Sequence, residues 1–176
     1  MKKLYLILFT LLSIGATAQE SSDRSFTEFK TYLNILSPSV GFEMGISENQ
    51  SIMVAGGVRF LNDNITGDQE GSLNPFARLD FRNFYSKRTD SRFRSMSGAF
   101  IGFTSGYVFE GLTDESENSD FEDENEFYFA GVWGMQRNYR SRLRWSFHLG
   151  PGIRIVDGDV KGAFNANLTF GFVLGN

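Results

Sequence analysis

The residues best suited to chemistry gather in one stretch, RLRWSFHLGPGIRI, at positions 142–155. His148, the single histidine of the chain, stands two positions after Ser146, and a serine with a nearby histidine is the start of a nucleophilic pair. Such a pair also needs a carboxylate to orient the imidazole, and the stretch contains none. We therefore expect His148 to be an interior residue with satisfied hydrogen bonds, and we predict no enzymatic activity.

A second group of candidate ligands is acidic and lies in the segment EGLTDESENSDFEDEN, residues 110–125. Carboxylate oxygens are the ligands that Ca²⁺ prefers, but the spacing does not match an EF-hand loop, which requires a glycine at a fixed place. We expect a solvated loop and no cofactor, with cation binding as the weaker alternative. The carboxylates concerned are Asp114, Glu115, Glu117, Asp120, Glu122, Asp123 and Glu124.

The elements that must position these groups are strands, because apolar and polar residues alternate with a period of two. In residues 142–155, Trp145 and Phe147 alternate with Arg144, Ser146 and His148. The same pattern recurs along the chain and predicts eight strands, at about 29–36, 39–46, 51–60, 74–85, 98–109, 126–138, 142–155 and 163–174. The sixth segment carries apolar residues on both faces, so the pattern does not tell its two faces apart.

Turns between successive segments predict an up-and-down meander. An open sheet of this size would expose two hydrogen-bonding edges, so we expect it to close into an antiparallel barrel. The polar face carries charged residues among many glycines, a composition that suits a narrow interior better than a solvated surface. We expect an ionic network in the interior, formed by Glu43, Arg59, Arg78, Asp80, Arg82, Arg144, His148 and Arg154.

The opposite face is rich in aromatic side chains, among them Phe42, Phe103, Trp145 and Phe170. The chain has 19 phenylalanines and no cysteine. So many rings would overfill a small closed barrel, whereas a ring-rich outer surface is typical of transmembrane barrels. The segments also approach the roughly 9–11 residues that a tilted strand needs to cross a bilayer. The pattern therefore favours a transmembrane barrel over a soluble lipocalin-like barrel.

The N-terminus has the features of a secretory signal peptide. Lys2 and Lys3 precede the apolar run 4–12, and Ala16-Thr17-Ala18 fits a cleavage site. We expect residues 1–18 to be removed and residues 19–176 to form one barrel domain. Cleavage would take the net charge from -4 to -6, because both lysines are lost; this charge gives no general attraction to nucleic acid.

The connections have the asymmetry of an outer-membrane barrel. With both termini in the periplasm, the turns 47–50, 86–94 and 139–141 face the periplasm and are mostly short. The longest connections, 62–72 and 110–125, then face outward. The short turn between the first two strands is the exception.

The chain resembles the small eight-stranded outer-membrane β-barrels of Gram-negative bacteria, of the OmpA/OmpX shape, and within them an uncharacterised secreted subfamily. The resemblance implies a location in the outer membrane and a barrel fold, and no particular activity. The stretches that carry it are LNILSPSVGFEMGISENQSIMVAGGVRF, NPFARLDFRNFYSKR and SGAFIGFTSGYVF.

The sequence as a whole predicts an outer-membrane barrel with a plugged interior and a structural or surface-interaction role. Its expected partners are outer-membrane lipid, lipopolysaccharide and the outer-membrane assembly machinery, and we expect a monomer. Two alternatives stay open: a soluble periplasmic lipocalin-like carrier of an apolar ligand, and a barrel-embedded lipid-modifying enzyme that uses His148.

Overall fold

The structure is a computed structural model that describes residues 28–62, 71–87, 91–110 and 125–174. Within these ranges the chain is all-β and contains no helix, hence no helix long and apolar enough to cross a membrane. Its strands are β1 (Phe29–Asn34), β2 (Ser39–Gly45), β3 (Gln50–Asn62), β4 (Gly71–Lys87), β5 (Gly98–Val108), β6 (Glu126–Asn138), β7 (Leu143–Val156) and β8 (Asp159–Val173).

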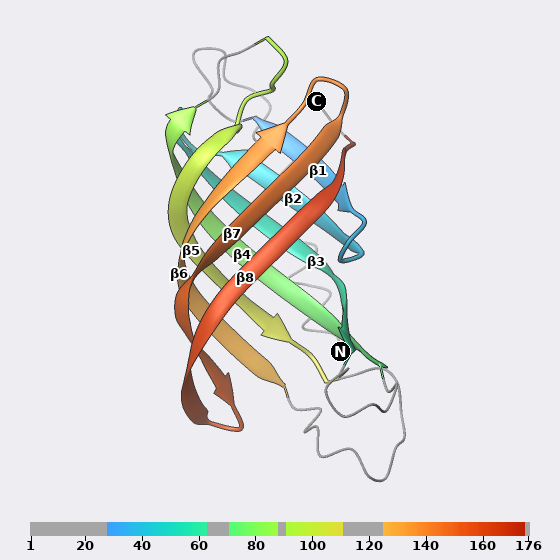
Figure 1. The fold of residues 1–176 in the computed structure, drawn as a ribbon, viewed down its shortest axis with the longest axis vertical. Coiled ribbons are helices and arrows are strands. Elements are labelled where there is room, and N and C mark those ends of the chain that lie inside the picture. Colours follow the sequence, from blue (N-terminus) through green and yellow to red (C-terminus); the bar gives the residue numbers. More distant parts are fainter. Residues whose placement is uncertain (1–27, 63–70, 88–90, 111–124, 175–176) are drawn as a thin grey trace, which may run out of the picture.

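The strands form one closed, antiparallel, up-and-down barrel in which each strand pairs with its neighbours in the chain (Figure 1). This confirms the predicted all-β architecture of eight antiparallel strands in up-and-down order. β1 and β8 close the ring through a short ladder of three residue pairs, from Tyr32 opposite Val173 to Asn34 opposite Gly171. Closure leaves neither β1 nor β8 as a fully exposed sheet edge, which is how barrels avoid strand-to-strand aggregation.

The start of β8 corrects the predicted boundary. We expected the last strand to begin near Ala163, but pairing with β7 continues to Val156 opposite Asp159. Asp157 and Gly158 both have positive φ, 51° and 86°, as the two central residues of a tight type I′ hairpin turn require. Because this turn matches the twist of the strands, the ladder runs up to it without a loop.

The pairing of β3 with β4 also extends beyond the prediction. The segment 62–72 was expected to be a loop, yet Asn62 lies opposite Gly71, so that loop is confined to residues outside the described ranges. At the other end, Lys87 pairs with Gly98 after a register shift between Phe84 and Ser86. Such a bulge bends a strand, and here it lets β4 continue into the basic segment that was predicted to be a turn.

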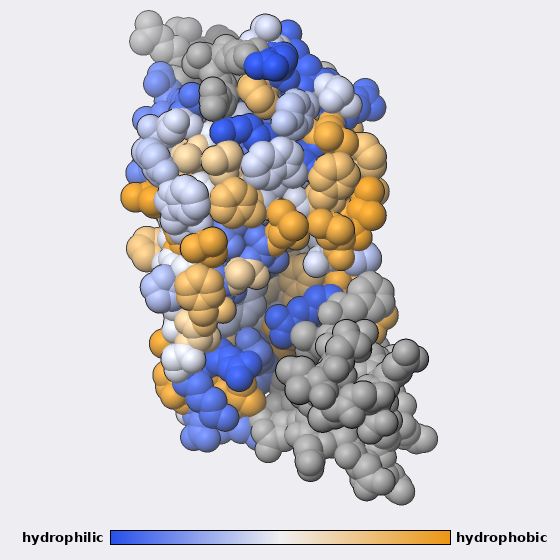
Figure 2. Space-filling view, viewed as in Figure 1, coloured by the Kyte–Doolittle hydropathy of each residue, from blue (hydrophilic) through white to orange (hydrophobic). Residues whose placement is uncertain are grey.

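The two faces of the barrel wall have opposite polarity. Outward positions carry large apolar side chains, among them Phe42, Phe103 and Leu168, each more than half exposed. Apolar residues spread over the visible side of the barrel in Figure 2. The faces of β6, which the sequence left undecided, are also clear: Phe129 and Trp133 are exposed, whereas Val132 is buried.

Two aromatic rings lie in the interior and were not anticipated there. Phe84 of β4 and Phe100 of β5 are buried and meet edge to face, with ring centroids 5.6 Å apart. Only outward-facing rings, such as Phe103 of β5, were predicted for these strands. Glycine makes room for another inward ring, that of Tyr128, since a Cβ on Gly106 would collide with it. Small inward residues thus allow long side chains to fill the bore.

Candidate functional site

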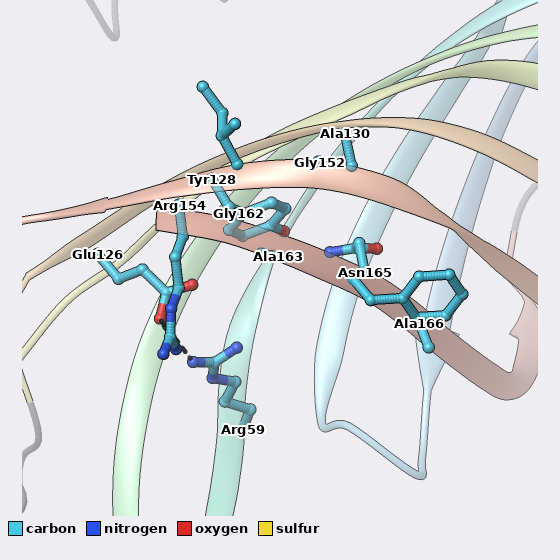
Figure 3. Close-up of a pocket in the computed structure, with 12 residues that line it drawn as sticks. Arg59, Glu126, Tyr128, Ala130, Gly152, Arg154, Gly162, Ala163, Asn165 and Ala166 are labelled. Carbon is cyan, nitrogen blue, oxygen red and sulfur yellow. Dashed lines mark ion pairs between the residues drawn. The ribbon is translucent and has the colours of Figure 1, made fainter. Parts of the chain in front are cut away.

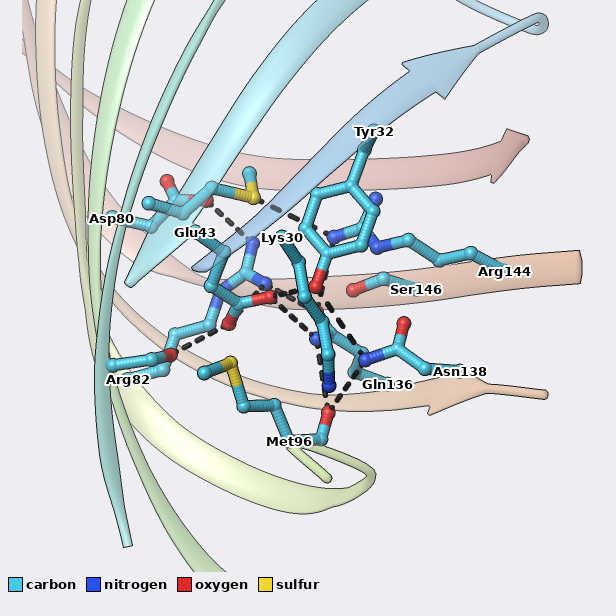
Figure 4. Close-up of polar contacts among 12 residues, drawn as sticks. Lys30, Tyr32, Glu43, Asp80, Arg82, Met96, Gln136, Asn138, Arg144 and Ser146 are labelled. Atoms are coloured by element: carbon cyan, nitrogen blue, oxygen red, sulfur yellow. Dashed lines mark hydrogen bonds and ion pairs between the residues drawn. The ribbon is translucent and has the colours of Figure 1, made fainter. Parts of the chain in front are cut away.

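The main candidate site is a network of buried polar side chains across the middle of the barrel (Figure 4). Its members come from β1, β2, β3, β4, β5, β6, β7 and β8, so it ties together strands that are distant in the ring. Each side chain reaches the interior because it occupies an inward position of its strand, where the period-two alternation places polar residues. The members with described contacts are Asn34, Tyr32, Glu43, Ser51, Arg78, Asp80, Arg82, Thr104, Gln136, Arg144 and Thr169.

Glu43 of β2 is the acceptor at the centre. Its carboxylate accepts hydrogen bonds from the Tyr32 hydroxyl at 2.5 Å, the Ser51 hydroxyl at 2.6 Å and the Gln136 amide at 2.8 Å. Arg82 Nη1 forms an ion pair with it at 3.6 Å. Glu43 is only 1% exposed, and a buried charge is tolerated when its lone pairs are satisfied in this way. Both carboxylate oxygens of Glu43 are therefore occupied by hydrogen bonds within the barrel.

Asp80 of β4 is the second buried carboxylate. It accepts hydrogen bonds from Arg82 Nη2 at 2.6 Å and from the Thr104 hydroxyl at 2.7 Å, and Arg78 Nε lies 3.3 Å away. Arg78, Asp80 and Arg82 stand at alternate positions of one strand, so all three point to the same side. Arg82 thereby joins both carboxylates, and its guanidinium also lies over the Phe100 ring, 5.1 Å from the centroid.

Arg144 of β7 is held by neutral groups. Its guanidinium donates to Asn34 Oδ1 at 3.1 Å and to Gln136 Oε1 at 3.0 Å. Gln136 Oε1 also accepts a hydrogen bond from Arg82, so one amide bridges the two arginines. The Arg144 guanidinium lies 3.9 Å from the centroid of the Tyr32 ring, a cation–π contact that is strengthened when water is excluded.

Residues 91–97, which precede β5, cover one end of the bore. Lys30 Nζ donates to the backbone oxygen and the hydroxyl of Ser95 at 2.6 and 2.5 Å, and it pairs with Glu28 at 3.2 Å. The Asn138 amide donates to the backbone oxygens of Ser95 and Met96 at 3.3 and 3.1 Å. These bonds hold the segment across the mouth beneath the central network.

The network has an excess of positive charge. Arg78, Arg82 and Arg144 face the two carboxylates Glu43 and Asp80, which leaves one guanidinium without a carboxylate partner in this cluster. Side chains this tightly bonded and this deeply buried can brace the strands against one another. Four of these side chains are essentially inaccessible to solvent: Arg82, Arg144, Tyr32 and Gln136.

His148 forms no described ion pair or hydrogen bond with the network, although it lies near enough to Asp80, Arg78 and Arg82 to interact with them electrostatically. It is buried in β7, and its Nε2 lies 3.2 Å from Asn165 Oδ1 of β8. Ser146, the suggested nucleophile, shares its face and is buried too. The contacts described for His148 pair it with Asn165 rather than with Ser146 or a carboxylate, so the geometry does not assemble a serine–histidine–acid triad.

Arg59 and Arg154, which the sequence assigned to the same network, lie near the other end of the bore with Glu126 (Figure 3). Arg59 Nη2 and Arg154 Nη1 approach the same carboxylate oxygen of Glu126 at 3.7 and 3.8 Å. These side chains line a cavity of about 380 Å³ that opens to the outside. The predicted residues therefore separate into a buried group, Glu43, Arg78, Asp80, Arg82 and Arg144, with His148 apart, and this rim group.

The acidic loop lies outside the described residues, so its suggested cation site is not placed. Within the ranges that the structure does describe, no cluster of histidine and acidic side chains could hold a metal ion. The predicted signal peptide, residues 1–18, also falls outside these ranges.

Sequence reasoning missed several members of the network, above all Tyr32, Lys30 and Gln136. The first strand was not divided into faces, although the polar residues Lys30 and Asn34 share their alternate positions with Tyr32. Gln136 and Asn138 end the ambiguous sixth strand, and their spacing of two was the signal that could have oriented it. If the more polar set of alternate positions in each strand is assigned to the interior, five further interior residues are predicted: Lys30, Tyr32, Asn34, Gln136 and Asn138.

Comparison with known proteins gave no match: no family model, no curated protein and no solved structure is significantly similar to this chain. The case for a function therefore depends on the residues and their geometry.

Proposed function

We propose that this protein is an integral outer-membrane β-barrel with a structural or surface-interaction role and a closed bore. The observation that supports this proposal most strongly is the inverted polarity of the barrel. Guanidinium and carboxylate groups fill the interior, and most exposed positions in the middle of the wall are apolar. Such inversion suits a barrel whose outer face contacts hydrocarbon, since a water-soluble protein seldom exposes so large a continuous apolar surface.

The outer aromatic residues fit a membrane interface. Trp133 Nε1 donates to the Tyr85 hydroxyl at 2.6 Å, and Trp145 and Phe147 stack with centroids 6.1 Å apart. All four belong to the half of the barrel that contains the β6–β7 turn. Tyrosine and tryptophan with polar tips are typical of the level where lipid headgroups meet water. This half would then face the periplasm, in agreement with the predicted location of the short turns.

The buried network argues against transport through the bore. An eight-stranded barrel has room for side chains and no wide channel, and Arg82, Gln136 and Arg144 occupy the cross-section here. A lipocalin-like carrier needs an apolar interior for its ligand, and a buried ionic network does not supply one. Enzymatic modification of lipid would need a nucleophile poised beside His148, whose described partner is Asn165.

Membrane fractionation and electrophoretic mobility test this proposal together. We expect the mature chain to begin at Gln19, to sediment with outer membranes, and to need detergent for solubility. Folded barrels that resist dodecyl sulfate migrate differently before and after boiling, so we expect a heat-dependent shift. Protease added to intact cells should cleave within 110–125 if the longer connections face outward.

Two results would overturn the proposal. Purification as a stable monomer without detergent would show that the outer face tolerates water. Recovery in the soluble periplasmic fraction would instead support the carrier alternative. A deletion of residues 114–124 serves as a control, because we expect it to abolish surface cleavage in that loop and to leave the heat-dependent shift intact.

A further inference from the structure

The barrel wall has a notch beside the β1–β2 hairpin. β1 ends at Asn34 and β2 begins at Ser39, so the turn between them stops well short of the β7–β8 turn (Figure 1). The β1–β8 ladder covers only residues 171–173 of β8, with one further bond at each end: the Ile35 amide donates to the Phe170 oxygen, and the Leu174 amide donates to the Thr31 oxygen. From Asp159 to Thr169, β8 therefore pairs only with β7 among the described residues.

The cavity that contains Arg59 and Arg154 opens at this notch. Five consecutive residues of β8, 162–166, line it. Consecutive residues of a strand point to opposite faces, so a cavity lined by all of them must pass around the edge of β8 that has no strand partner among the described residues. Arg59 of β3 contributes from across the notch (Figure 3). The cavity is thus a side opening that joins the bore to the outer surface.

Positive charge dominates the ionic side chains that line this opening. Arg59 and Arg154 share the single carboxylate of Glu126 at 3.7 and 3.8 Å, distances longer than those of a strong charge-assisted hydrogen bond. Their side chains are 34% and 50% exposed, so both guanidiniums can contact a ligand. A phosphate is the natural complement of two such guanidiniums.

Both outer margins of the notch are apolar. On the β8 side Val160, Phe164 and Leu168 are 64%, 67% and 57% exposed, and Phe164 also lines the cavity. On the hairpin side Ile35 and Leu36 are 53% and 57% exposed. The opening thus has charged groups on its inner side and apolar side chains on its outer margins, an arrangement that complements a ligand that is polar at one end and apolar at the other.

We propose that the notch between β8 and β3 binds an anionic, phosphate-bearing amphiphile. The phosphate lies between Arg59 and Arg154, and the acyl chains run outward over Phe164 and Leu168. This inference depends on the proposed membrane location and extends it by naming a lipid-binding site. It also gives the exposed arginines a role, because the central network does not use them.

The test uses a fluorescent label in the notch of the full mature protein in a neutral alkyl maltoside detergent. The chain has no cysteine, so Ala166→Cys supplies a single labelling site beside the cavity. We expect lysophosphatidylglycerol to produce a saturable change in fluorescence. Its apparent Kd should be at least tenfold lower than that of lysophosphatidylcholine or inorganic phosphate. The double variant Arg59→Gln with Arg154→Gln should weaken lysophosphatidylglycerol binding at least tenfold, whereas Arg140→Gln, an exposed residue at the far end, should not.

Folding of every variant is checked by the heat-dependent gel shift. If the double variant fails to fold, Ala163→Phe replaces it: the larger side chain fills the cavity, keeps both arginines, and should also weaken binding at least tenfold. Equal binding of the two lysolipids, or equally tight binding of free phosphate, would overturn the inference. A fluorescence change that depends on protein concentration and not on lipid concentration would mean that β8 pairs with a second copy of the chain. That result would also overturn the inference.

Failure of this inference can be distinguished from failure of the proposed function. A protein that needs detergent, shows the gel shift and does not discriminate between the lysolipids remains a membrane barrel without the lipid site. A protein that is stable without detergent contradicts the membrane proposal whatever the titration gives.

Discussion

The two groups of interior charges share one barrel and one face of the wall, yet they are held very differently. In the middle of the bore Glu43 and Asp80 accept hydrogen bonds of 2.5–2.8 Å, and Arg82 and Arg144 are each 1% exposed. Near the open end, Arg59 and Arg154 reach Glu126 only at 3.7 and 3.8 Å and stay in contact with solvent.

An inward position alone therefore does not define the role of a charged residue. Where the wall is complete, water is excluded and each charge needs fixed partners, so the residues become structural. Where the short β1–β2 hairpin leaves the wall open, solvent screens the charges, their mutual bonds loosen, and they remain available to a ligand. We therefore expect substitutions in the buried group to change the free energy of unfolding, and substitutions in the rim group to change ligand binding.

The largest expected effect is that of Glu43→Gln. The substitution keeps the shape and removes the charge that compensates the buried Arg82, so the free energy of unfolding should fall by about 3–5 kcal/mol. Urea unfolding followed by tryptophan fluorescence in lipid vesicles measures the change. Glu126→Gln is the matched control, expected to cost under about 1 kcal/mol; equal losses for both variants would contradict the division into two groups.

A smaller effect is expected at the covered mouth. Lys30→Met removes the two hydrogen bonds to Ser95, so the segment 91–97 should open more readily, by about 1.5–3 kcal/mol. Hydrogen exchange of its backbone amides, read by mass spectrometry, should speed up there and not in β8. Lys161→Met, at the open end, is the control; unchanged exchange in 91–97 after Lys30→Met would show that Lys30 does not hold the cover.

On the outer face, Trp133→Phe removes the hydrogen bond to Tyr85 and should cost about 0.5–1.5 kcal/mol. Tyr85→Phe breaks the same bond and should cost a similar amount. The double variant should cost less than the sum of the two single variants, as a shared interaction requires. Full additivity in urea unfolding would mean that the two residues stabilise the outer belt independently.

The smallest effect is expected for Arg154→Gln. Half of its side chain is exposed and its ion pair is long, so the free energy of unfolding should change by less than about 1 kcal/mol. The same variant should measurably weaken lysophosphatidylglycerol binding. A large loss of stability would place Arg154 with the buried group and remove the contrast between the two ends.

Much of this fold could be predicted from the sequence, because a barrel wall imposes a strict period of two on its residues. The eight strands and their antiparallel order follow from alternation and turn residues, and the predicted bounds of β6 match the structure at both ends. The assignment of Glu43, Arg78, Asp80, Arg82 and Arg144 to one inward-facing group followed from the same alternation.

The contacts that could not be predicted from the sequence depend on the register of the strands around the barrel. The bridge from Gln136 to Glu43 joins residues that are far apart in the chain, on strands that are not adjacent. The separation of Arg59 and Arg154 from the central network depends on how far each strand extends along the barrel. The notch depends on the short β1–β2 hairpin beside the long β8, a contrast that the predicted boundaries understated.

The orientation of the wall is tested most directly by spin labels on adjacent residues of β8. Leu168→Cys faces outward and Asn167→Cys faces inward, in a chain with no other cysteine. In lipid bilayers, a label at 168 should collide readily with oxygen, which dissolves in hydrocarbon, and rarely with a water-soluble nickel chelate. A label at 167 should be shielded from oxygen. Higher oxygen accessibility at 167, or ready access of the nickel chelate to 168, would contradict a barrel with an apolar outer face embedded in lipid.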